Sequence, residues 1–589
     1  MSSSLLRSVF DDVCSFLSVK ASSHFFVAAI PTLTLSLLPH LETDNSSIQV
    51  RIFAQVPYIA TNSLLMSMPL HVGNVPTNNY SLQNPLEVHD SLGELPLYFV
   101  DGPDAEYRQW FPLRPVSGDI ALLFTTYPRQ VDASTRPGPR IDLREDQGGL
   151  IGSGEAFIPQ LATFHANDQL SIHVEWDLSE AAEQVVAAWT FGDGPSTIYE
   201  GTMRSLLSSV FAVGPLNNKT SQVSLPSGQV ETFGVYWIGD PPFNIEILTE
   251  KLTHLFTGMA SFFNDSGAMY KIFIRHSTAP SFGGTAFLRS FIFEYSSGLE
   301  ITMEDSLSIL AHEMVHNWPY LDLCTPFPIS SVSVFSGACD DDRTWFNEGV
   351  AVYYSTVLPY RLGIYTTSQF TDILNANAQA YYTSPLVNIS NADATSRAWQ
   401  TFHAQRLSYY RGFMYLLAVD AQIRAMSNGT RSVDDVVLAL LARRQAGGPH
   451  GVNDFLGLVS DALGTGGESL TIASYNEMAS GSQFVVPPME SPDFVGLSIR
   501  REEMPLFELG FAESSVSQGM ISGLVAGSRA AEAGLQNGDM VIKSSFYGFT
   551  ADVMDRWMHI QVRHSGGEEM RVQYWPRAKK TMVQGYQWG

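Results

Sequence analysis

Polar and apolar residues alternate with a period of two through much of the first part of the chain. Residues 32–37 and 170–176 show this clearly, as expected for strands whose successive side chains point to opposite faces of a sheet. Segments rich in proline and glycine separate such runs, and one of them, residues 132–154, is predicted to be a mobile loop. The pattern predicts a β-sandwich-like domain over residues 25–240, preceded by an arm or short helix over residues 1–24.

The hydrophobic period lengthens after this β domain. Apolar side chains recur at steps of three and four, which predicts a helix over residues 242–263. A strand is expected over residues 270–275, and further helices are expected over residues 349–358 and 412–426. Together these elements predict a mainly helical domain over residues 241–485.

A third domain is predicted at the end of the chain. Prolines interrupt residues 478–493, as in a linker. Beyond it, short strands surround a stretch in which Ser528 can begin a helix, Gly534 can end it, and residues 537–539 can form a turn. The pattern indicates a small separate domain over residues 490–580.

The composition fits a large folded protein. The chain has 589 residues, of which 45% are hydrophobic and 16% charged, so several domains are expected. The net charge is −25 without any run of lysine and arginine, which argues against nucleic acid as a partner. The three cysteines, Cys14, Cys324 and Cys339, are too few for a disulfide framework; Cys324 and Cys339 could pair, or could be two buried thiols.

No segment is long and apolar enough to be predicted as a membrane span. The most apolar early run, residues 25–38, is cut by Pro31 and is shorter than the ~20 residues that a spanning helix needs. Charged residues interrupt the N-terminal apolar stretch, so no clear secretory signal is present. We therefore expect a cytoplasmic protein, while secretion stays open.

One stretch carries the pattern of a catalytic metal site. His312 and His316 lie one helical turn apart in a His-Glu-x-x-His motif, so both imidazoles can reach one metal ion. Glu313 is placed to act on a metal-bound water rather than to bind the metal. Thr302 and Asp305 form a predicted capping box at the start of this helix. The alternative interpretation is a pair of surface histidines on a helix.

A third protein ligand is needed, since a catalytic zinc site combines three side chains with one open position. The best candidate is Glu348, which lies 32 residues after His316 at the start of a predicted helix. Two ligand helices packed side by side would bring the three groups together. Charge runs are more typical of solvated loops, which disfavours the rivals Asp340, Asp341 and Asp342.

With these residues in place, the chain resembles the glycyl aminopeptidase family of the gluzincins, zinc peptidases with a thermolysin-like catalytic domain and a C-terminal PDZ domain. Residues 312–318, 345–349 and 409–412 carry the resemblance, and the order of the domains also matches. The resemblance implies a Zn²⁺ ion held by His312, His316 and Glu348. It also implies that Glu313 takes a proton from water and later delivers it to the leaving amine.

The resemblance gives Tyr409 a role as well. In the related aminopeptidases a tyrosine two residues before a Lys-Gly pair stabilises the transition state. Tyr409 occupies that position here, with Arg411 where the relatives carry lysine. Tyr410 is the nearest competitor for the role, and an ordinary core aromatic is the other interpretation of Tyr409.

The chain departs from the family before the zinc helix. Relatives carry an edge strand there whose backbone holds the substrate and whose glutamate binds the free amine. The corresponding stretch has Gly283 and Gly284, which let a peptide backbone approach, but it has no acidic residue. Selectivity for a free N-terminus is therefore open, as is endopeptidase activity. A simple turn is the alternative interpretation of the two glycines.

The last domain contains a stretch that resembles the carboxylate-binding loop of PDZ domains, formed by Leu509, Gly510 and Phe511. Backbone N–H groups of such a loop can receive the C-terminus of a peptide. Packing against the catalytic domain is the equally supported alternative.

The sequence as a whole predicts a multidomain α+β protein with a β-sandwich-like domain, a thermolysin-like, mainly helical catalytic domain and a PDZ-like domain. Its expected activity is zinc-dependent hydrolysis of peptide bonds, as an aminopeptidase on small or unfolded peptides. The alternative is a catalytically silent relative that binds peptides through its PDZ and β domains. No nucleophile-elbow motif and no phosphate-binding loop support a different enzyme class.

Overall fold

The structure is a computed structural model of the 589-residue chain. It describes residues 30–42, 45–132, 135–165, 167–225, 227–267, 269–279, 281–296, 302–321, 343–486, 497–545 and 547–589. The predicted N-terminal arm, the three cysteines and the acidic run 340–342 lie outside the described residues, so what was expected of them stays a prediction.

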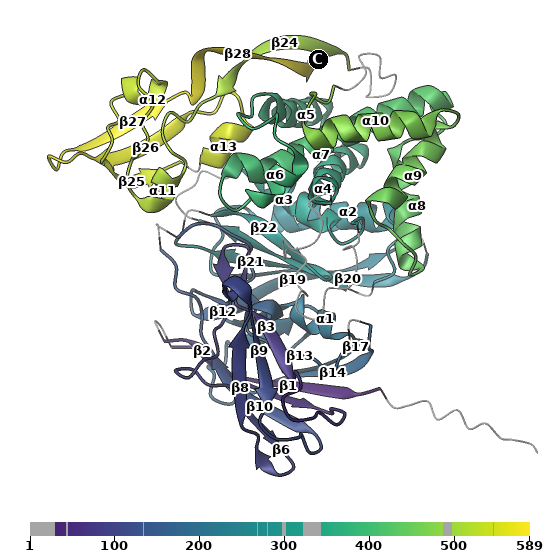
Figure 1. Ribbon diagram of the computed structural model, residues 1–589, viewed down its shortest axis with the longest axis vertical. Coiled ribbons are helices and arrows are strands. Elements are labelled where there is room, and N and C mark those ends of the chain that lie inside the picture. The colour runs from purple at the N-terminus through teal and green to yellow at the C-terminus, as the bar shows by residue number, and fades with distance from the viewer. Residues whose placement is uncertain are drawn as a thin grey trace, which may run out of the picture.

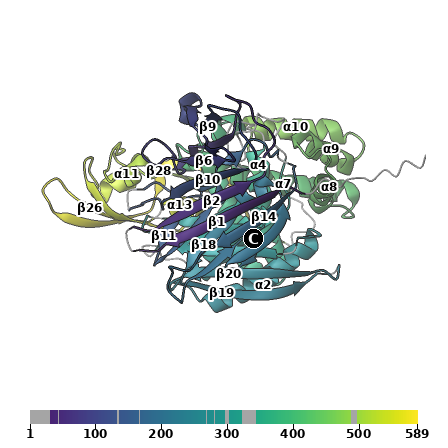
Figure 2. The same cartoon turned by 90° about the horizontal axis from the view of Figure 1, so that it is seen from below.

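The first part of the chain folds into β-sheets, drawn in purple and blue in Figure 1. The largest has seven strands, and Figure 2 shows several of them side by side from below. In order they are β17 (Ser196–Gly201), β14 (Leu170–Trp176), β1 (Thr32–His40), β2 (Ser47–Ala54), β10 (Ile120–Thr126), β6 (Glu87–Asp90) and β7 (Gly93–Glu94). Every second side chain of β1 and β14 is buried, which confirms the two strands predicted from alternation.

Two further sheets and a small hairpin complete this part of the fold. The five-stranded sheet contains β11 (Arg144–Asp146), β12 (Gly149–Ser153), β18 (Val210–Gly214), β15 (Val186–Trp189) and β16 (Gly192–Asp193). The four-stranded sheet contains β13 (Gln160–Leu161), β3 (Met66–Pro69), β9 (Tyr107–Pro112) and β8 (Leu97–Asp101), and β4 (His71–Val72) pairs with β5 (Val75–Pro76). A short helix, α1 (Met203–Leu207), precedes β18.

The prediction of a mobile loop over residues 132–154 is wrong for its second half. Strands β11 and β12 lie there, and every residue of β12 is buried between two neighbouring strands. A strand that is buried on both faces shows no alternation of polar and apolar residues. Its glycines also allow close packing, since a Cβ on Gly152 would lie 2.5 Å from the Cα of Leu143. The pattern of a loop and that of a fully buried, glycine-containing strand are therefore hard to distinguish.

A second five-stranded sheet packs against the helices. Its strands, in order, are β19 (Leu216–Ser224), β20 (Val230–Ile238), β21 (Met269–His276), β23 (Ser290–Tyr295) and β22 (Phe282–Phe287), so β22 is an edge strand. On β21, Ile272 and Ile274 face the helices while Phe273 packs into the core of the N-terminal sheets. The sheet thus lies between the N-terminal strands and the helices, as Figure 1 shows.

The helices of this region lie on the other side of the sheet, as Figure 1 shows. They are α2 (Ile245–Phe262), α3 (Met303–Val315), α4 (Thr344–Arg361), α5 (Thr367–Tyr382), α6 (Asn391–Ser396), α7 (Phe402–Ser427), α8 (Val433–Gln445), α9 (Val452–Leu463) and α10 (Gly467–Ser480). The helices predicted over residues 242–263, 349–358 and 412–426 are confirmed as parts of α2, α4 and α7. None of the helices in the described part of the chain is both long and apolar enough to cross a membrane.

The end of the chain forms a small lobe, drawn in yellow in Figure 1. It contains a three-stranded sheet of β25 (Met540–Ser544), β26 (Met558–Arg563) and β27 (Glu569–Tyr574), with α11 (Ser514–Gln518), α12 (Arg529–Glu532) and α13 (Tyr547–Asp552). The pair β24 (Ile499–Phe507) and β28 (Arg577–Trp588) runs back over α5. There Asn375 exchanges two hydrogen bonds with the backbone of Trp588, whose side chain is buried in the helical core. The last strand therefore anchors the lobe to the helices.

Candidate metal and catalytic site

Helix α3 presents the two histidines of the motif. Its start is fixed by the predicted capping box, in which the Thr302 hydroxyl accepts a hydrogen bond from the Asp305 amide at 3.0 Å and the Asp305 carboxylate accepts one from the Thr302 amide at 3.1 Å. His316 follows the last residue of the helix in a helical conformation, with φ −57° and ψ −13°. The one-turn spacing from His312 is therefore kept, although the helix ends between the two residues.

A close helix crossing brings the other candidate residues to α3. Helices α4 and α7 meet at Gly349 and Gly412, where a Cβ on Gly349 would lie 2.5 Å from the Cα of Gly412. A Cβ on Gly412 would overlap the carbonyl oxygen of Trp345. Only glycine at both positions allows the two backbones to approach this closely. The crossing places Glu348 of α4 and Tyr409 of α7 next to the histidines.

The three predicted metal ligands converge on one point. His312 Nε2 lies 3.2 Å from Glu348 Oε2 and 3.2 Å from His316 Nε2. His316 Nε2 lies 3.6 Å from Glu348 Oε2. These three residues are the one group of histidine, cysteine and acidic side chains in the described part of the chain whose donor atoms gather closely enough to hold a metal ion. The alternative of two surface histidines is wrong, because both side chains are mostly buried.

The triangle of donor atoms fits a small tetrahedral cation. Zinc binds imidazole nitrogen and carboxylate oxygen at about 2.0–2.2 Å, so two ligand atoms of a tetrahedral site lie roughly 3.3 Å apart. The observed separations of 3.2, 3.2 and 3.6 Å surround that value. Two neutral nitrogens and one carboxylate are also the donor set of catalytic zinc sites that keep a fourth position open.

The electrostatics of the site keep Glu348 ionised. Burial alone would raise the pKa of its carboxyl, but the charges and hydrogen bonds of His316 and His312 hold that pKa well below its ordinary value. The balance is opposite for His316. Burial would lower its pKa, but the Glu348 carboxylate raises that pKa above its ordinary value. The Glu348 carboxyl is therefore ionised near neutral pH and is able to bind a cation there.

Glu313 lies beside the donor triangle, against the edge strand β22. A Cβ on Gly284 would come within 2.7 Å of the Glu313 carboxyl carbon and 2.9 Å of its Oε1. Burial raises the pKa of the Glu313 carboxyl, and the neighbouring histidines oppose that rise. A carboxylate with increased proton affinity is suited to accept a proton from water. Gly283 and Gly284 thus lie in a strand, not in the simple turn that was the alternative interpretation.

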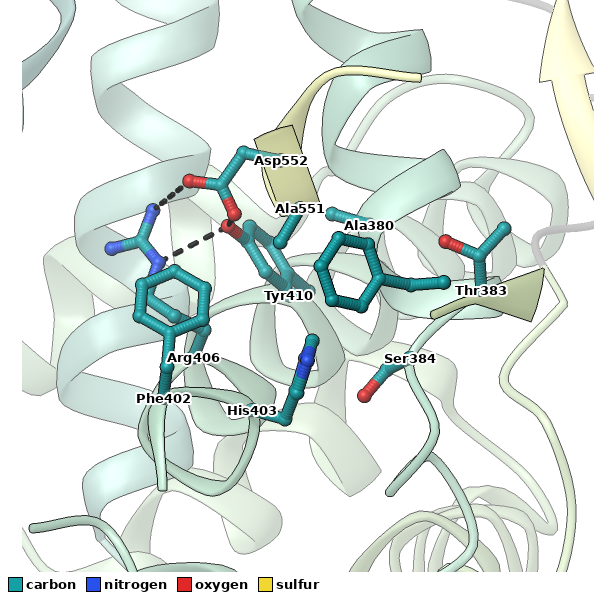
Figure 3. Close-up of a pocket in the computed structure, with 10 residues that line it drawn as sticks. Ala380, Thr383, Ser384, Phe402, His403, Arg406, Tyr410, Ala551 and Asp552 are labelled. Carbon is teal, nitrogen blue, oxygen red and sulfur yellow. Dashed lines mark hydrogen bonds and ion pairs between the residues drawn. The ribbon is translucent and has the colours of Figure 1, made fainter. Parts of the chain in front are cut away.

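Tyr409 faces the site, whereas Tyr410 faces away from it. The Tyr409 ring stacks on His312, with 5.4 Å between ring centroids, and the Glu348 charge helps to raise the pKa of its hydroxyl. The Tyr410 hydroxyl instead donates to Asp552 of the C-terminal lobe and accepts from Arg406 at 3.1 Å, as Figure 3 shows. Tyr409 is therefore the tyrosine that can reach a bound substrate.

Arg411, which replaces the lysine of the relatives, does not reach the site. Its side chain is fully buried and donates to the Asn391 side chain at 2.8 Å and to the backbone oxygens of Val387 and Ile389 at 2.7 Å each. The residue fixes the segment before α6 against α7.

The predicted carboxylate loop of the C-terminal lobe is well packed. Leu509 and Phe511 are buried, the Leu509 carbonyl accepts a hydrogen bond from the Tyr574 hydroxyl at 2.7 Å, and Gly510 has a φ of +87°. A Cβ on Gly510 would lie 2.7 Å from the Cβ of Ala530, so glycine is needed there. These contacts describe packing, and binding of a peptide C-terminus to this loop stays a prediction.

Arg140 lies close to the site and was not predicted from the sequence. Arg140, from the segment before β11, lies along β22: its amide donates to the Thr285 hydroxyl at 2.8 Å and its Nη1 lies 3.5 Å from the Gly284 carbonyl oxygen. More than 140 positions separate the two segments in the sequence. No local pattern could have indicated their contact.

Comparison with known proteins relates the chain to peptidases. The family model of the M61 glycyl aminopeptidases matches residues 305–414, which carry the donor triangle, Glu313 and Tyr409. No curated protein matches the sequence. Among solved structures, an aminopeptidase N family protein from Idiomarina loihiensis has a TM-score of 0.63 at 13% identity, over 94% of this chain and 98% of that one. At this identity the likeness concerns the fold alone.

An M1 zinc metallopeptidase from Deinococcus radiodurans, solved with a Tyr-Ser-Ala substrate, has a TM-score of 0.48 at 14% identity, over 78% of this chain and 95% of that one. This score is too low to carry an argument. The family match over the site and the convergence of its donor atoms define the chain as a peptidase. The segment that carries the site is thus similar to the M61 glycyl aminopeptidases.

Proposed function

We propose that the protein hydrolyses peptide bonds as a zinc-dependent aminopeptidase acting on small or unfolded peptides. The observation that carries this proposal is the convergence of His312, His316 and Glu348, whose donor atoms lie within 3.6 Å of one another, with the Glu313 carboxyl beside them. His312, His316 and Glu348 would hold the ion. A bound Zn²⁺ supplies a water of lowered pKa and polarises the carbonyl of the bond to be cleaved.

The chain's own residues account for the remaining steps. Glu313 takes a proton from the attacking water and returns it to the leaving amine, a transfer that its raised pKa favours. The Tyr409 hydroxyl donates a hydrogen bond to the oxyanion that develops on the substrate carbonyl. The backbone of β22, opened by Gly283 and Gly284, pairs with the extended substrate.

Metal analysis combined with a peptide-library assay tests the proposal, on the natural chain and on Glu313→Gln. We expect one zinc per chain in both, and a loss of cleavage of about 10²- to 10⁴-fold in the variant, because the proton acceptor is removed. Glu304→Gln is a matched control, since Glu304 is an exposed residue in the first turn of the same helix. Cleavage that survives in Glu313→Gln, or a natural chain without zinc, would contradict the proposal.

The catalytically silent scaffold is the less favoured function, because the donor atoms and the general base are all present. The finer expectations extend the proposal: a PDZ-like domain over residues 490–580 that receives a peptide C-terminus, and a cytoplasmic location. Limited proteolysis at residues 478–493 and peptide binding by the full chain are the measurements that bear on the first of these.

A further inference from the structure

The guanidinium group of Arg140 lies along the strand that is expected to hold the substrate. Its Nη1 is 3.5 Å from the Gly284 carbonyl oxygen and its Nη2 is 3.3 Å from the Ser281 hydroxyl. A Cβ on Gly283 would lie 2.8 Å from the same Nη2, so the missing side chain of Gly283 leaves room for the guanidinium. The positive charge is therefore held against β22 itself.

The same strand also contacts the general base. The Glu313 carboxyl lies against Gly284, and the Arg140 guanidinium lies against Gly283 and the Gly284 carbonyl. Consecutive glycines of one strand thus separate the reacting carboxylate from a fixed cation. A substrate that pairs with β22 must pass next to Arg140.

Arg140 belongs to a hollow with an excess of positive charge. This hollow is small and partly open, and its lining has five arginines and two acidic residues. The two acids are already engaged: Arg275 binds Asp142 and Glu294 at 2.8 Å each. The charged residues of the lining are Arg129, Arg136, Arg140, Arg144, Arg275, Asp142 and Glu294.

Some guanidinium N–H donors in this hollow have no hydrogen-bond acceptor in the described part of the chain. Arg140 Nε and Arg144 Nη1 are buried and have no hydrogen-bond partner among the described residues. Arg144 is 7% exposed, so it meets little solvent. Buried donors without a partner are costly and are rare in folded proteins unless a ligand or water completes them. The unused groups are N–H donors of guanidinium, which match the geometry of a carboxylate.

We propose that the hollow beside β22 is a carboxylate-binding subsite, so that the enzyme prefers peptides with a carboxylate near the bond it cleaves. This inference rests on the proposed peptidase function and assigns its substrate class. The acidic residue that would attract a free amine is absent from residues 282–287, and a fixed cation lies there instead. Such a cation attracts an acidic side chain or the C-terminus of a short peptide.

The test compares peptides that differ in one charge. Alanine pentapeptides with a C-terminal amide carry one glutamate or one glutamine at each position in turn, and a further all-alanine peptide has a free C-terminal carboxylate. We measure kcat/KM for the zinc-loaded natural chain, Arg140→Gln, Arg140→Lys and the control Arg51→Gln, which removes an exposed arginine from β2. The Glu313→Gln variant, titrated calorimetrically with the same peptides, reports binding without cleavage.

We expect the natural chain to favour glutamate over glutamine by about 10-fold or more at one position, or the free carboxylate over the amide, because a charge-assisted hydrogen bond is of that strength. Arg140→Gln should abolish the preference, because kcat/KM on the favoured carboxylate peptide should fall by about 10-fold or more relative to kcat/KM on its uncharged counterpart. Arg140→Lys should keep part of it, and Arg51→Gln all of it. The favoured peptide shows whether the hollow binds an acidic side chain or the C-terminus of the peptide.

Equal cleavage of all the peptides by the natural chain would overturn the subsite and leave the peptidase function intact. So would an equal loss on both kinds of peptide in Arg140→Gln, since that indicates a purely structural arginine. If no peptide is cleaved, the proposed function fails, and the calorimetric comparison still decides whether carboxylate peptides bind preferentially.

Discussion

At the scale of single residues, the site depends on a carboxylate placed between two imidazoles. Glu348 is held ionised by His312 and His316, and the Tyr409 ring stacks on His312. Burial, followed by the Glu348 charge, raises the pKa of Tyr409 well above its ordinary value. The hydroxyl therefore keeps its proton throughout the neutral range and remains a hydrogen-bond donor.

Tyr409→Phe tests this role against that of the neighbouring tyrosine. Removal of one oxyanion donor costs about 10²- to 10³-fold in kcat, so we expect a decrease of that size with little change in KM. Tyr410→Phe should stay within a few-fold of the natural chain, because its hydroxyl points to Asp552. Steady-state kinetics on both variants decide the assignment, and the reverse order of effects would make Tyr410 the functional residue.

Glu155 gives the folded protein a pH dependence that is independent of the site. Burial raises its pKa from 4.5 to about 8, although the charge of Arg204 opposes the rise. The folded chain thus binds this proton more tightly than the unfolded chain, and the free energy of unfolding falls as pH rises from 4.5 to about 8. The loss is at most about 5 kcal/mol for a shift of this size.

Thermal unfolding of Glu155→Gln should reveal this effect. We expect the variant to melt at a higher temperature than the natural chain at pH 8, and at the same temperature at pH 4.5. Glu200→Gln, which changes an exposed glutamate of β17, should match the natural chain at both pH values. A variant that is no more stable than the natural chain at pH 8 would contradict the raised pKa.

At the scale of elements, the crossing of α4 and α7 determines whether the site can form. Its two glycines bring the backbones together, and the ligand Glu348 is the residue before one of them. Tyr409 lies three residues before the other. A side chain at the crossing would have to push the helices apart, because the atoms it meets are backbone atoms.

Gly412→Ala should therefore disturb both stability and metal binding. We expect a loss of about 1–3 kcal/mol in the free energy of unfolding, the usual cost of overpacking, together with weaker zinc affinity. The control is Gly457→Ala in α9, where the added methyl meets nothing within 4 Å and alanine favours the helix by about 1 kcal/mol. Chemical denaturation and zinc titration measure the two effects. Equal behaviour of the two variants would contradict the importance of the crossing.

Local patterns predicted those parts of the site that local structure determines. The spacing of His312 and His316 and the capping box are properties of one helix, and both are confirmed. Glu348 followed from a motif at the start of a second helix. Arg140 and strand β12 could not be predicted, because a contact over 140 positions and a strand buried on both faces leave no periodic signal.

At the scale of the whole molecule, the C-terminal lobe is connected to the catalytic helices through α7. The guanidinium of Arg406 lies 4.5 Å from the centroid of the Tyr409 ring. The Asp552 carboxylate of α13 lies 3.2 Å from the same guanidinium. Figure 3 shows Asp552 bridging Arg406 and Tyr410. The lobe therefore contributes the anion that holds Arg406 over the ring of the functional tyrosine.

Asp552→Asn should lower kcat by roughly 3- to 10-fold while KM and zinc content stay unchanged, because a cation held only by the ring and by Tyr410 positions Tyr409 less well. Asp555→Asn, an exposed change in the same lobe, should have no effect. Unchanged kinetics in both variants would show that the lobe is bound to the helices without influencing the site.

Diffraction data collected at the zinc absorption edge from crystals of the zinc-loaded protein test the central claim most directly. We predict one strong anomalous peak bonded to His312 Nε2, His316 Nε2 and a Glu348 oxygen at about 2.0–2.2 Å. A peak at any other group of side chains, or a Glu348 carboxylate turned out of reach of the ion, would contradict the account.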